Sequence, residues 1–404
     1  MNYTKPGKLH YRIAQAVCWV VSKVIFRNKV LRNEIKGKEG PFVVIANHEC
    51  AYDFVNLICA TARPMSFVIS QSFFSTLPIR GFLQKMGVIP KQQFQTTVKD
   101  MKRMKAVIDH EQPLVIYPAG LMCEDGLSTP IPEATFKFLK WLGADVYVAR
   151  STGSYFVMPK WTKGMRPGKT TIDIYKLFDK DDLVQMGVER IKKATCDALL
   201  FDAYREQEAL MARYSKNDQI GGLENVLYVC PHCGEEYSIT VKDGNTLYCG
   251  KCGYAQTSDQ YGFLHNTGGI GPEIRYVSDW SRLIYDNTKE QLRNEPNVTL
   301  SAKCVFRMIQ QSKKKFVDVG RGELTLSNGA FRIVGNIGEE VDFTIPAGNA
   351  PTLPFSPGKH LEIQHGSDIY RCVLDDGRQV MKFINMVKIF YELRNCERAE
   401  VHAD

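Results

Sequence analysis

Two groups of residues in this sequence have types and spacing that suit chemistry, and the first is His48 with Asp53 in the segment NHECAYD at 47–53. A histidine can take a proton at neutral pH, and a carboxylate can orient it and stabilise its charged form. The pair therefore indicates a general base for a hydroxyl group, as acyl transfer from a thioester to an alcohol requires. Because the chain has eight histidines, a histidine five residues before an aspartate can occur by chance, and the spacing alone is weak evidence for a catalytic pair. A purely structural His48 is the alternative.

The second group consists of the segments CPHC and CGKC, separated by 15 residues. Four thiolates at this spacing form a tetrahedral zinc site, and four protein ligands leave no open position for catalysis. We predict one structural zinc ion in a zinc ribbon, held by Cys230, Cys233, Cys249 and Cys252. His232 is not expected to be a ligand. A redox dithiol pair is the alternative, but it requires a thioredoxin-like context that is absent here. The protein partner of the ribbon is unknown.

Short apolar runs predict buried strands, and longer stretches between them predict helices. The strands are Phe42–Ala46, Pro113–Tyr117 and Asp145–Ala149, and the helices are Thr96–His110 and Glu133–Leu142. This alternation predicts an α/β layered domain, in which loops at strand ends carry the chemistry. Residues five apart lie about 140° apart around a continuous helix. We therefore expect His48 in the loop or first turn and Asp53 on the following helix.

In this setting, roughly residues 10–205 resemble the lysophosphatidate (1-acylglycerol-3-phosphate) acyltransferase family. That family has an Asn-His-x-x-x-x-Asp block after its first buried strand, matched here by Asn47, His48 and Asp53. Its second block is matched by GVIPKQQ at 87–93 and its third by YPAGL at 117–121. A fourth block, with a late proline, corresponds to FVMP at 156–159.

The resemblance implies an enzyme that moves an acyl chain from acyl-coenzyme A or acyl carrier protein to a hydroxyl of a lysophospholipid or related glycerolipid, in phospholipid biosynthesis. It assigns catalysis to His48 and Asp53. The substrate-binding residues that it implies are Asn47, Lys91, Gln93, Pro118, Ala119 and Gly120.

Two of these positions depart from the family pattern: Ala119 replaces a glutamate and Gln93 replaces an arginine. Both are thought to hold the polar end of the acceptor, so the departures put the acceptor in question more than the reaction. Lys91 is the nearest cation for an acceptor phosphate, with a solvated surface lysine as the alternative. Gly120 would let backbone N–H groups approach a phosphate or thioester oxygen, unless it only makes a turn. The rival function is a non-catalytic scaffold that binds lipid or nucleic acid.

The first 40 residues carry nine Lys or Arg and two Glu, a balance of +7 within the net +8 of the chain. The apolar stretch 13–22 is too short to span a bilayer, which takes about 20 residues. A signal peptide is the alternative, but no small-residue cleavage site follows. We expect an amphipathic helix at 8–28 on the surface of an anionic membrane, unless it only packs on its own domain. Charge alone does not distinguish lipid from nucleic acid, and no sequence feature firmly indicates nucleic acid.

Twelve cysteines, of which four are paired in Cys-x-x-Cys spacing, favour a reducing cytoplasm over a disulfide framework. We therefore expect a cytoplasmic protein, peripheral on the membrane. A chain of 404 residues suggests two or three domains. We predict an acyltransferase-like domain at 1–215, the zinc ribbon at 216–265, and at 266–404 a helix followed by a strand-rich domain that is closed by a helix. The last part faintly resembles a pleckstrin-homology-like module.

The segment boundaries come from local patterns. The polar stretch Tyr214–Glu224 predicts a linker. Helices are expected at Val277–Arg293 and at Arg378–Arg394, the latter with Val380, Phe383 and Val387 on one face and polar residues, including Lys382 and Asn385, on another.

Overall fold

The computed structural model describes residues 4–94, 97–214, 219–310, 315–347, 351–366 and 368–401. By its internal contacts the chain divides into two compact units. The first comprises residues 1–159 and 164–215, and the second comprises residues 160–163 and 216–404.

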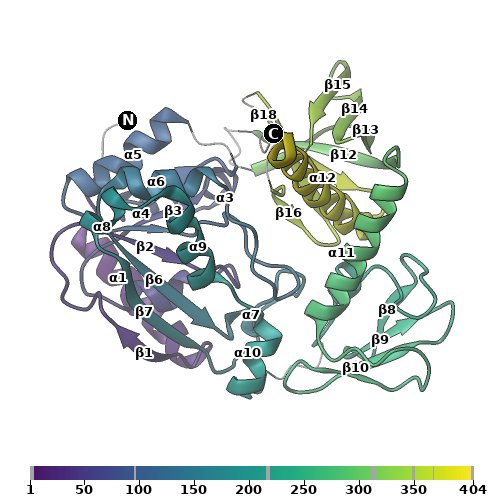
Figure 1. Cartoon of the computed structure of the whole chain (residues 1–404), viewed down its shortest axis with the longest axis horizontal. Helices are drawn as coiled ribbons and strands as arrows, with labels where there is room; N and C mark the ends of the chain where they lie inside the picture. The colour runs from purple at the N-terminus through teal and green to yellow at the C-terminus, as the bar shows by residue number, and fades with distance from the viewer. Residues whose placement is uncertain are drawn as a thin grey trace. The chain divides into compact units, whose positions relative to one another are not determined.

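The first unit is built on a seven-stranded sheet of order β1-β7-β6-β2-β5-β3-β4 (Figure 1). Its strands are β1 (Lys29–Asn33), β2 (Phe42–Ala46), β3 (Ser66–Ser70), β4 (Ile89–Lys91), β5 (Leu114–Ile116), β6 (Asp145–Thr152) and β7 (Thr171–Phe178). Strands β2 to β6 pair in parallel, whereas β7 runs antiparallel to β6 and β1 runs parallel to β7. The carboxyl ends of β2, β3, β4, β5 and β6 therefore meet at one edge of the sheet.

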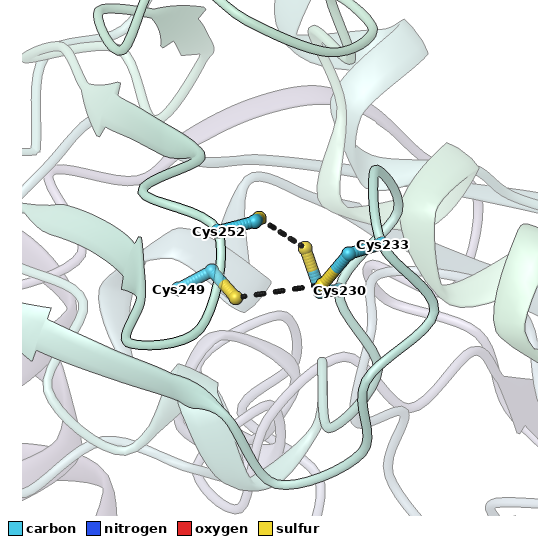
Figure 2. A group of neighbouring side chains, drawn as sticks. All are labelled: Cys230, Cys233, Cys249 and Cys252. Carbon is cyan, nitrogen blue, oxygen red and sulfur yellow. Dashed lines mark hydrogen bonds between the residues drawn. The ribbon is translucent and has the colours of Figure 1, made fainter.

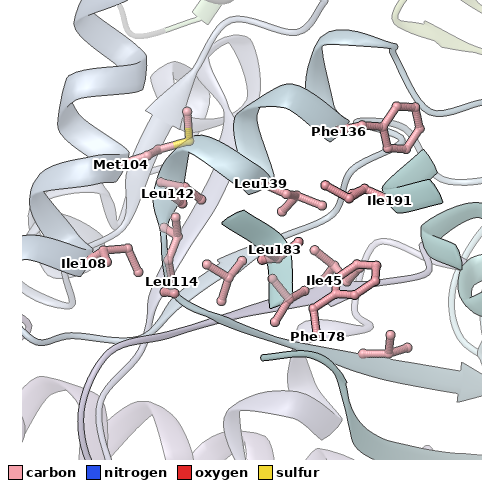
Figure 3. Close-up of a cluster of buried hydrophobic side chains, with 14 of the residues drawn as sticks. Ile45, Met104, Ile108, Leu114, Phe136, Leu139, Leu142, Phe178, Leu183 and Ile191 are labelled. Carbon is pink, nitrogen blue, oxygen red and sulfur yellow. The ribbon is translucent and has the colours of Figure 1, made fainter. Parts of the chain in front are cut away.

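Ten helices of this unit lie among the described residues. They are α1 (Lys8–Val24), α2 (Phe54–Ile58), α3 (Gln71–Thr76), α4 (Arg80–Lys85), α5 (Val98–Asp109), α6 (Ala134–Leu142), α7 (Ser154–Val157), α8 (Lys180–Gln185), α9 (Val188–Leu199) and α10 (Ala203–Leu210). Val43 and Ile45 of β2 belong to a core cluster with side chains from α5, α6 and α9 (Figure 3). Phe42 and Val44 point to the other face and are also fully buried. Burial of β2 on both faces explains its uninterrupted apolar run, and the expected α/β layered fold is confirmed.

Helix α1 packs on its own unit through one face. The Ser22 hydroxyl donates to Asn56 Oδ1 at 2.8 Å, and Gln15 Nε2 donates to the carbonyl oxygens of Ile58 and Thr61 at 2.9 and 2.6 Å. The helix ends at Val24, four residues earlier than expected. Within the described residues, no helix combines the length and the apolar character that crossing a bilayer requires.

The second unit contains two antiparallel sheets. The smaller, of order β11-β10-β9-β8, consists of β8 (Ile239–Lys242), β9 (Thr246–Cys249), β10 (Ala255–Ser258) and β11 (Leu264–Asn266). The larger has seven strands in the order β15-β14-β13-β12-β18-β17-β16. They are β12 (Leu300–Gln310), β13 (Lys315–Ser327), β14 (Ala330–Asn336), β15 (Glu340–Pro346), β16 (Phe355–Ser356), β17 (His360–His365) and β18 (Asp368–Leu374). Helix α11 (Val277–Asn294) joins the sheets, and α12 (Val380–Val401) follows the larger one, so the expected strand-rich region closed by a helix is confirmed.

The expectation of one polar face on α12 is only partly correct. Asn385 is buried, and its Nδ2 lies 3.5 Å from the hydroxyl of Tyr228. Lys382 pairs with both carboxylate oxygens of Glu236 at 2.8 Å. The segment that precedes β8 therefore covers a second face of α12, which periodicity within the helix could not reveal.

The predicted linker Tyr214–Glu224 is anchored at both ends of its described part. Tyr214 is buried, donates its hydroxyl hydrogen to the Lys169 carbonyl at 2.6 Å and stacks on Phe156. Leu223 is fully buried in a short 3-10 helix, η1 (Leu223–Asn225). Residues 215–218 lie outside the described residues.

Candidate active site and metal centre

His48 and Asp53 meet in the turn that leads from β2 to α2. The Nδ1 atom of His48 lies 3.0 Å from Oδ2 of Asp53. The His48 side chain is 22% exposed and that of Asp53 is 1% exposed, so a substrate can reach the imidazole but not the carboxylate. Asp53 is the residue before α2 and not part of the helix, which corrects the expectation from spacing. The turn is closed by the Asp53 N–H, which donates to the Cys50 carbonyl at 3.4 Å, so the two side chains meet without lying on one continuous helix.

The protein holds the Asp53 carboxylate with several donors. Its Oδ2 atom accepts hydrogen bonds from the backbone N–H groups of Glu49 at 2.7 Å and Cys50 at 3.0 Å, in addition to the His48 contact. Its Oδ1 atom lies 3.4 Å from the Cys50 sulfur, whose S–H donates. A carboxylate fixed in this way orients the imidazole and leaves Nε2 as the ring nitrogen for a substrate.

Asn47 bridges the turn to strand β6. Its Oδ1 accepts from the Ser151 N–H at 2.8 Å, and its Nδ2 donates to the Ser151 carbonyl at 2.8 Å and to Glu49 Oε1 at 3.2 Å. The amide is therefore engaged inside the protein, and it holds the segment that carries His48 against a neighbouring strand end.

Glu49, which the sequence did not single out, is fully buried beside the pair. Its Oε2 accepts a hydrogen bond from the Tyr155 N–H at 2.9 Å. Burial, together with the negative charges of Glu206 and Asp53, raises the pKa of Glu49 well above its ordinary value. The carboxyl group anchors the turn to the start of α7. Its position inside the motif was the only sequence signal for it.

Tyr117, directly after β5, is a second neighbour of the pair that sequence reasoning did not assign. Its ring centre lies 4.6 Å from that of His48. Its hydroxyl oxygen is buried and has no hydrogen-bond partner among the described residues. Burial and the negative charge of Asp53 raise the pKa of this phenol well above its ordinary value, so it stays neutral.

Gln93 joins the ends of three strands. Its Nε2 donates to the Gly120 carbonyl at 2.6 Å, and its Oε1 accepts from the Ser70 hydroxyl at 3.1 Å. Gly120 has a φ of +70°, and its N–H donates to the Tyr117 carbonyl at 2.9 Å, which closes a turn. The third block therefore forms a tight turn that Gln93 fastens to β3 and β4.

The remaining sequence-predicted residues lie in the same region. Lys91 ends β4 opposite Ser70 and is partly buried, with Nζ 3.0 Å from the Gln92 carbonyl. Burial lowers the pKa of Lys91. Pro118 is buried and Ala119 is partly exposed. The backbone N–H of Cys123 donates to the His48 carbonyl at 3.1 Å, so the loop after β5 packs directly against the pair.

Residues 23–160 match the family model described as acyltransferase. These residues form an acyltransferase family domain. The 1-acyl-sn-glycerophosphate (LPA) acyltransferase PlsC from Thermotoga maritima is a similar solved structure, with 18% identity and a TM-score of 0.41. That match covers 52% of this chain and 81% of PlsC. No curated protein matches the chain.

Outside the acyltransferase domain, four cysteine sulfurs converge in the second unit. Figure 2 shows Cys230 and Cys233 of one knuckle facing Cys249 and Cys252 of the other. The four sulfurs lie within 4.8 Å of one another. Gly234 and Gly253, which follow the knuckles, have φ values of +73° and +82° and so adopt the left-handed conformation that tight turns favour.

The distances within this cluster suit a metal and not disulfides. The sulfur of Cys230 lies 3.7 Å from that of Cys252, and the sulfur of Cys233 lies 3.8 Å from that of Cys249. A disulfide requires about 2.0 Å. Four thiolates bound to one zinc ion at about 2.3 Å would be separated by about 3.8 Å in a tetrahedron. The cluster thus has the ligands and the spacing that a metal ion needs.

Proposed function

We propose that the acyltransferase domain transfers an acyl chain from acyl-coenzyme A or acyl carrier protein to a hydroxyl of a lysophospholipid or related glycerolipid. The observation that carries this proposal is the His48–Asp53 pair, with one nitrogen of the imidazole held by a buried carboxylate and the ring partly exposed. The family match of residues 23–160 supports the same reaction class.

In the proposed reaction, Nε2 of His48 takes the proton of the acceptor hydroxyl as its oxygen attacks the thioester carbonyl. Asp53 stabilises the imidazolium that forms. When the tetrahedral intermediate collapses, the carbon–sulfur bond breaks, and the imidazolium returns the proton to the leaving thiolate. The balanced products are the acylated acceptor and the free thiol of the carrier.

The acceptor site is proposed around the strand ends that carry Lys91, Gln93 and the turn 118–120. Because Gln93 already bonds Ser70 and Gly120, we propose that it shapes this site and does not grip a phosphate. Asn47 has the same kind of positioning role behind His48. Lys91 is the proposed cation for an acidic head group.

We propose that α1 holds the protein on the membrane surface. Its outward face exposes Leu9, Ile13, Val17, Trp19, Val20 and Val24. Exposed cations flank this face at Lys8, Arg12, Lys23 and Arg27. Apolar side chains that enter the interface, beside cations that attract anionic lipid head groups, are the features of a surface-bound helix.

We also propose that the four-cysteine cluster binds one zinc ion with a structural role. Zinc would link the two knuckles that lie next to α11 and α12 in the second unit. The Trp280 indole N–H on α11 donates to the Val229 carbonyl, directly before the first knuckle, at 2.9 Å. Arg378, just before α12, donates to the Tyr237 carbonyl at 2.9 Å.

The test of the reaction is mass spectrometry of lipids made by purified protein that is offered acyl-coenzyme A, acyl carrier protein and a panel of lysophospholipid and neutral glycerolipid acceptors. We expect a new acylated lipid together with free thiol. Ala119→Glu, at a partly exposed position, is expected to raise the rate or widen the acceptor range. If the wild type acylates nothing and Ala119→Glu with Gln93→Arg becomes active, the scaffold function is correct instead.

A further inference from the structure

The two oxygens of the Asp53 carboxylate have very different surroundings. Oδ2 contacts the His48 imidazole and accepts hydrogen bonds from the backbone N–H groups of Glu49 and Cys50, all at 2.7 to 3.0 Å. For Oδ1, the contact among the described residues is the sulfur of Cys50 at 3.4 Å. Backbone donors are the same whatever residue stands at 50, whereas the donor to Oδ1 belongs to the cysteine side chain.

We propose that Cys50 is a positioning residue whose thiol hydrogen bond to Asp53 sets how strongly that carboxylate stabilises a proton on His48. A donor on Oδ1 withdraws negative charge from the carboxylate. The imidazolium beside Oδ2 is then stabilised less than it would be by a bare carboxylate, because the thiol and the imidazolium both draw on the negative charge of Asp53.

The thiol is suited to this role because it keeps its hydrogen. Cys50 is fully buried, and burial together with the negative charge of Asp53 raises the pKa of the thiol well above its ordinary value. A fully buried thiol cannot reach an acyl thioester, so Cys50 does not carry the acyl chain. The Cys50 sulfur also accepts from the Tyr52 N–H at 3.4 Å, which fixes its direction within the turn.

Other titratable groups surround the pair, and they define what the test must hold constant. They come from the same turn, from the loop after β5, from β6 and from α10, and they are Glu49, Tyr117, Cys123, Glu124, Asp125, Arg150 and Glu206. A substitution at 50 leaves all of them in place. Any change in His48 titration that is specific to position 50 therefore comes from the hydrogen bond to Asp53.

Cys123 provides a matched control. It is also fully buried beside the pair, and its sulfur lies 3.6 Å from the Glu49 carbonyl, to which it donates. Cys123→Ala removes a neighbouring buried thiol without removing a donor from Asp53. Cavity and packing effects of the two alanine variants are therefore comparable.

The experiment is an NMR titration of the His48 ring protons in the full-length protein without substrate, assigned by comparison with His48→Ala. In Cys50→Ala we expect the protonation midpoint to rise by about half a pH unit, because a thiol is a weak donor. Cys50→Ser places a stronger donor at this position, so its midpoint should lie below that of the wild type. Cys123→Ala should leave the midpoint unchanged.

The role of Cys50 in catalysis rests on the proposed function, in which His48 is the base. The NMR titration itself does not require turnover. Absence of acyl transfer would overturn the proposed function and leave the titration intact. Equal midpoints in Cys50→Ala and Cys123→Ala would overturn the role of Cys50, as would a rise in Cys50→Ser as large as that in Cys50→Ala. If Cys50→Ala does not fold, Cys50→Ser decides alone: a midpoint below that of the wild type supports the proposal, and an unchanged or raised midpoint overturns it.

If the protein transfers acyl chains, the same shift can be read from the rate. On the acid side of the rate profile, kcat/KM of Cys50→Ala should fall by about threefold, because a midpoint raised by half a pH unit leaves about threefold less neutral imidazole to act as the base. At alkaline pH the difference should vanish. A pH-independent loss would indicate damage to the site and contradict the positioning role.

Discussion

The His48–Asp53 pair and the four-cysteine cluster both come from short sequence motifs, but they are built in different ways. The pair depends on segments from several strands: Asn47 is fastened to β6, and the loop after β5 packs against His48. The cluster needs only two knuckles that bring their sulfurs within 4.8 Å. The first leaves the His48 imidazole partly exposed, whereas the second directs four sulfurs toward one another. In this protein, the open site therefore depends on the surrounding fold more than the closed one does.

The largest effect is expected from breaking the closed site. Cys230→Ser with Cys252→Ser should abolish metal binding, because one ligand is lost from each knuckle. Structural zinc contributes apparent free energies of about 10 kcal/mol in small zinc modules, so unfolding of this region should become easier. Metal analysis and thermal unfolding with and without chelator are the measurements.

The control for this variant is Cys196→Ser, which changes a half-buried thiol outside the cluster. It should retain one zinc ion per chain and the wild-type unfolding profile. A reduced wild-type sample that holds no metal after gentle purification would contradict the assignment of a zinc site.

Breaking the open site should affect the reaction and leave the fold intact. His48→Ala should lower acyl transfer by about 10²- to 10⁴-fold, the contribution of a positioned general base. Stability should change little, because Asp53 retains two backbone donors. Steady-state kinetics and thermal unfolding measure the two effects separately.

His110→Ala is the matched histidine control, since its imidazole is exposed and contacts the Ala106 carbonyl at 2.7 Å. It should transfer acyl chains at the wild-type rate. Asp53→Asn should be slower than wild type because the amide keeps the backbone contacts but not the charge that stabilises the imidazolium. Full transfer by His48→Ala in an active preparation would disprove its role as the base.

The smallest effect is expected at the exposed face of α1. Val17→Asp with Val20→Asp places charges on two apolar side chains that are 61% and 52% exposed, so folding should be little affected. Binding to vesicles that contain anionic lipid should weaken by about tenfold or more, since each valine that enters the membrane contributes roughly 1.5 kcal/mol to binding. Vesicle sedimentation over a salt series measures this.

Val184→Asp on α8 tests whether the effect is specific to α1, because that valine is 65% exposed outside this helix. It should bind vesicles as the wild type does. Equal binding of the wild type to neutral and anionic vesicles would argue against the contribution of the cations around α1.

Much of the fold was readable from local patterns. Phe42–Ala46 is strand β2 with the expected bounds, and Val277–Arg293 differs from α11 by one residue. Such runs are buried on both faces or strongly amphipathic, so their local pattern is unambiguous. Two expectations failed. Asn385 was expected on a polar face of α12 but is buried by a second segment, and Asp53 was expected on the helix after β2 but lies in the turn before it.

The sequence by itself determined the candidate site residues, because the types and order of His48 and Asp53 and the spacing of the four cysteines are local properties. Only the tertiary structure showed what surrounds them. Gln93 joins three strand ends, Tyr117 lies on the imidazole, and the buried Cys50 thiol faces Asp53. These contacts depend on which strands lie side by side and on how the turn after β2 closes. Neither is encoded in the spacing of residues along the chain, since distant segments meet only when the sheet forms.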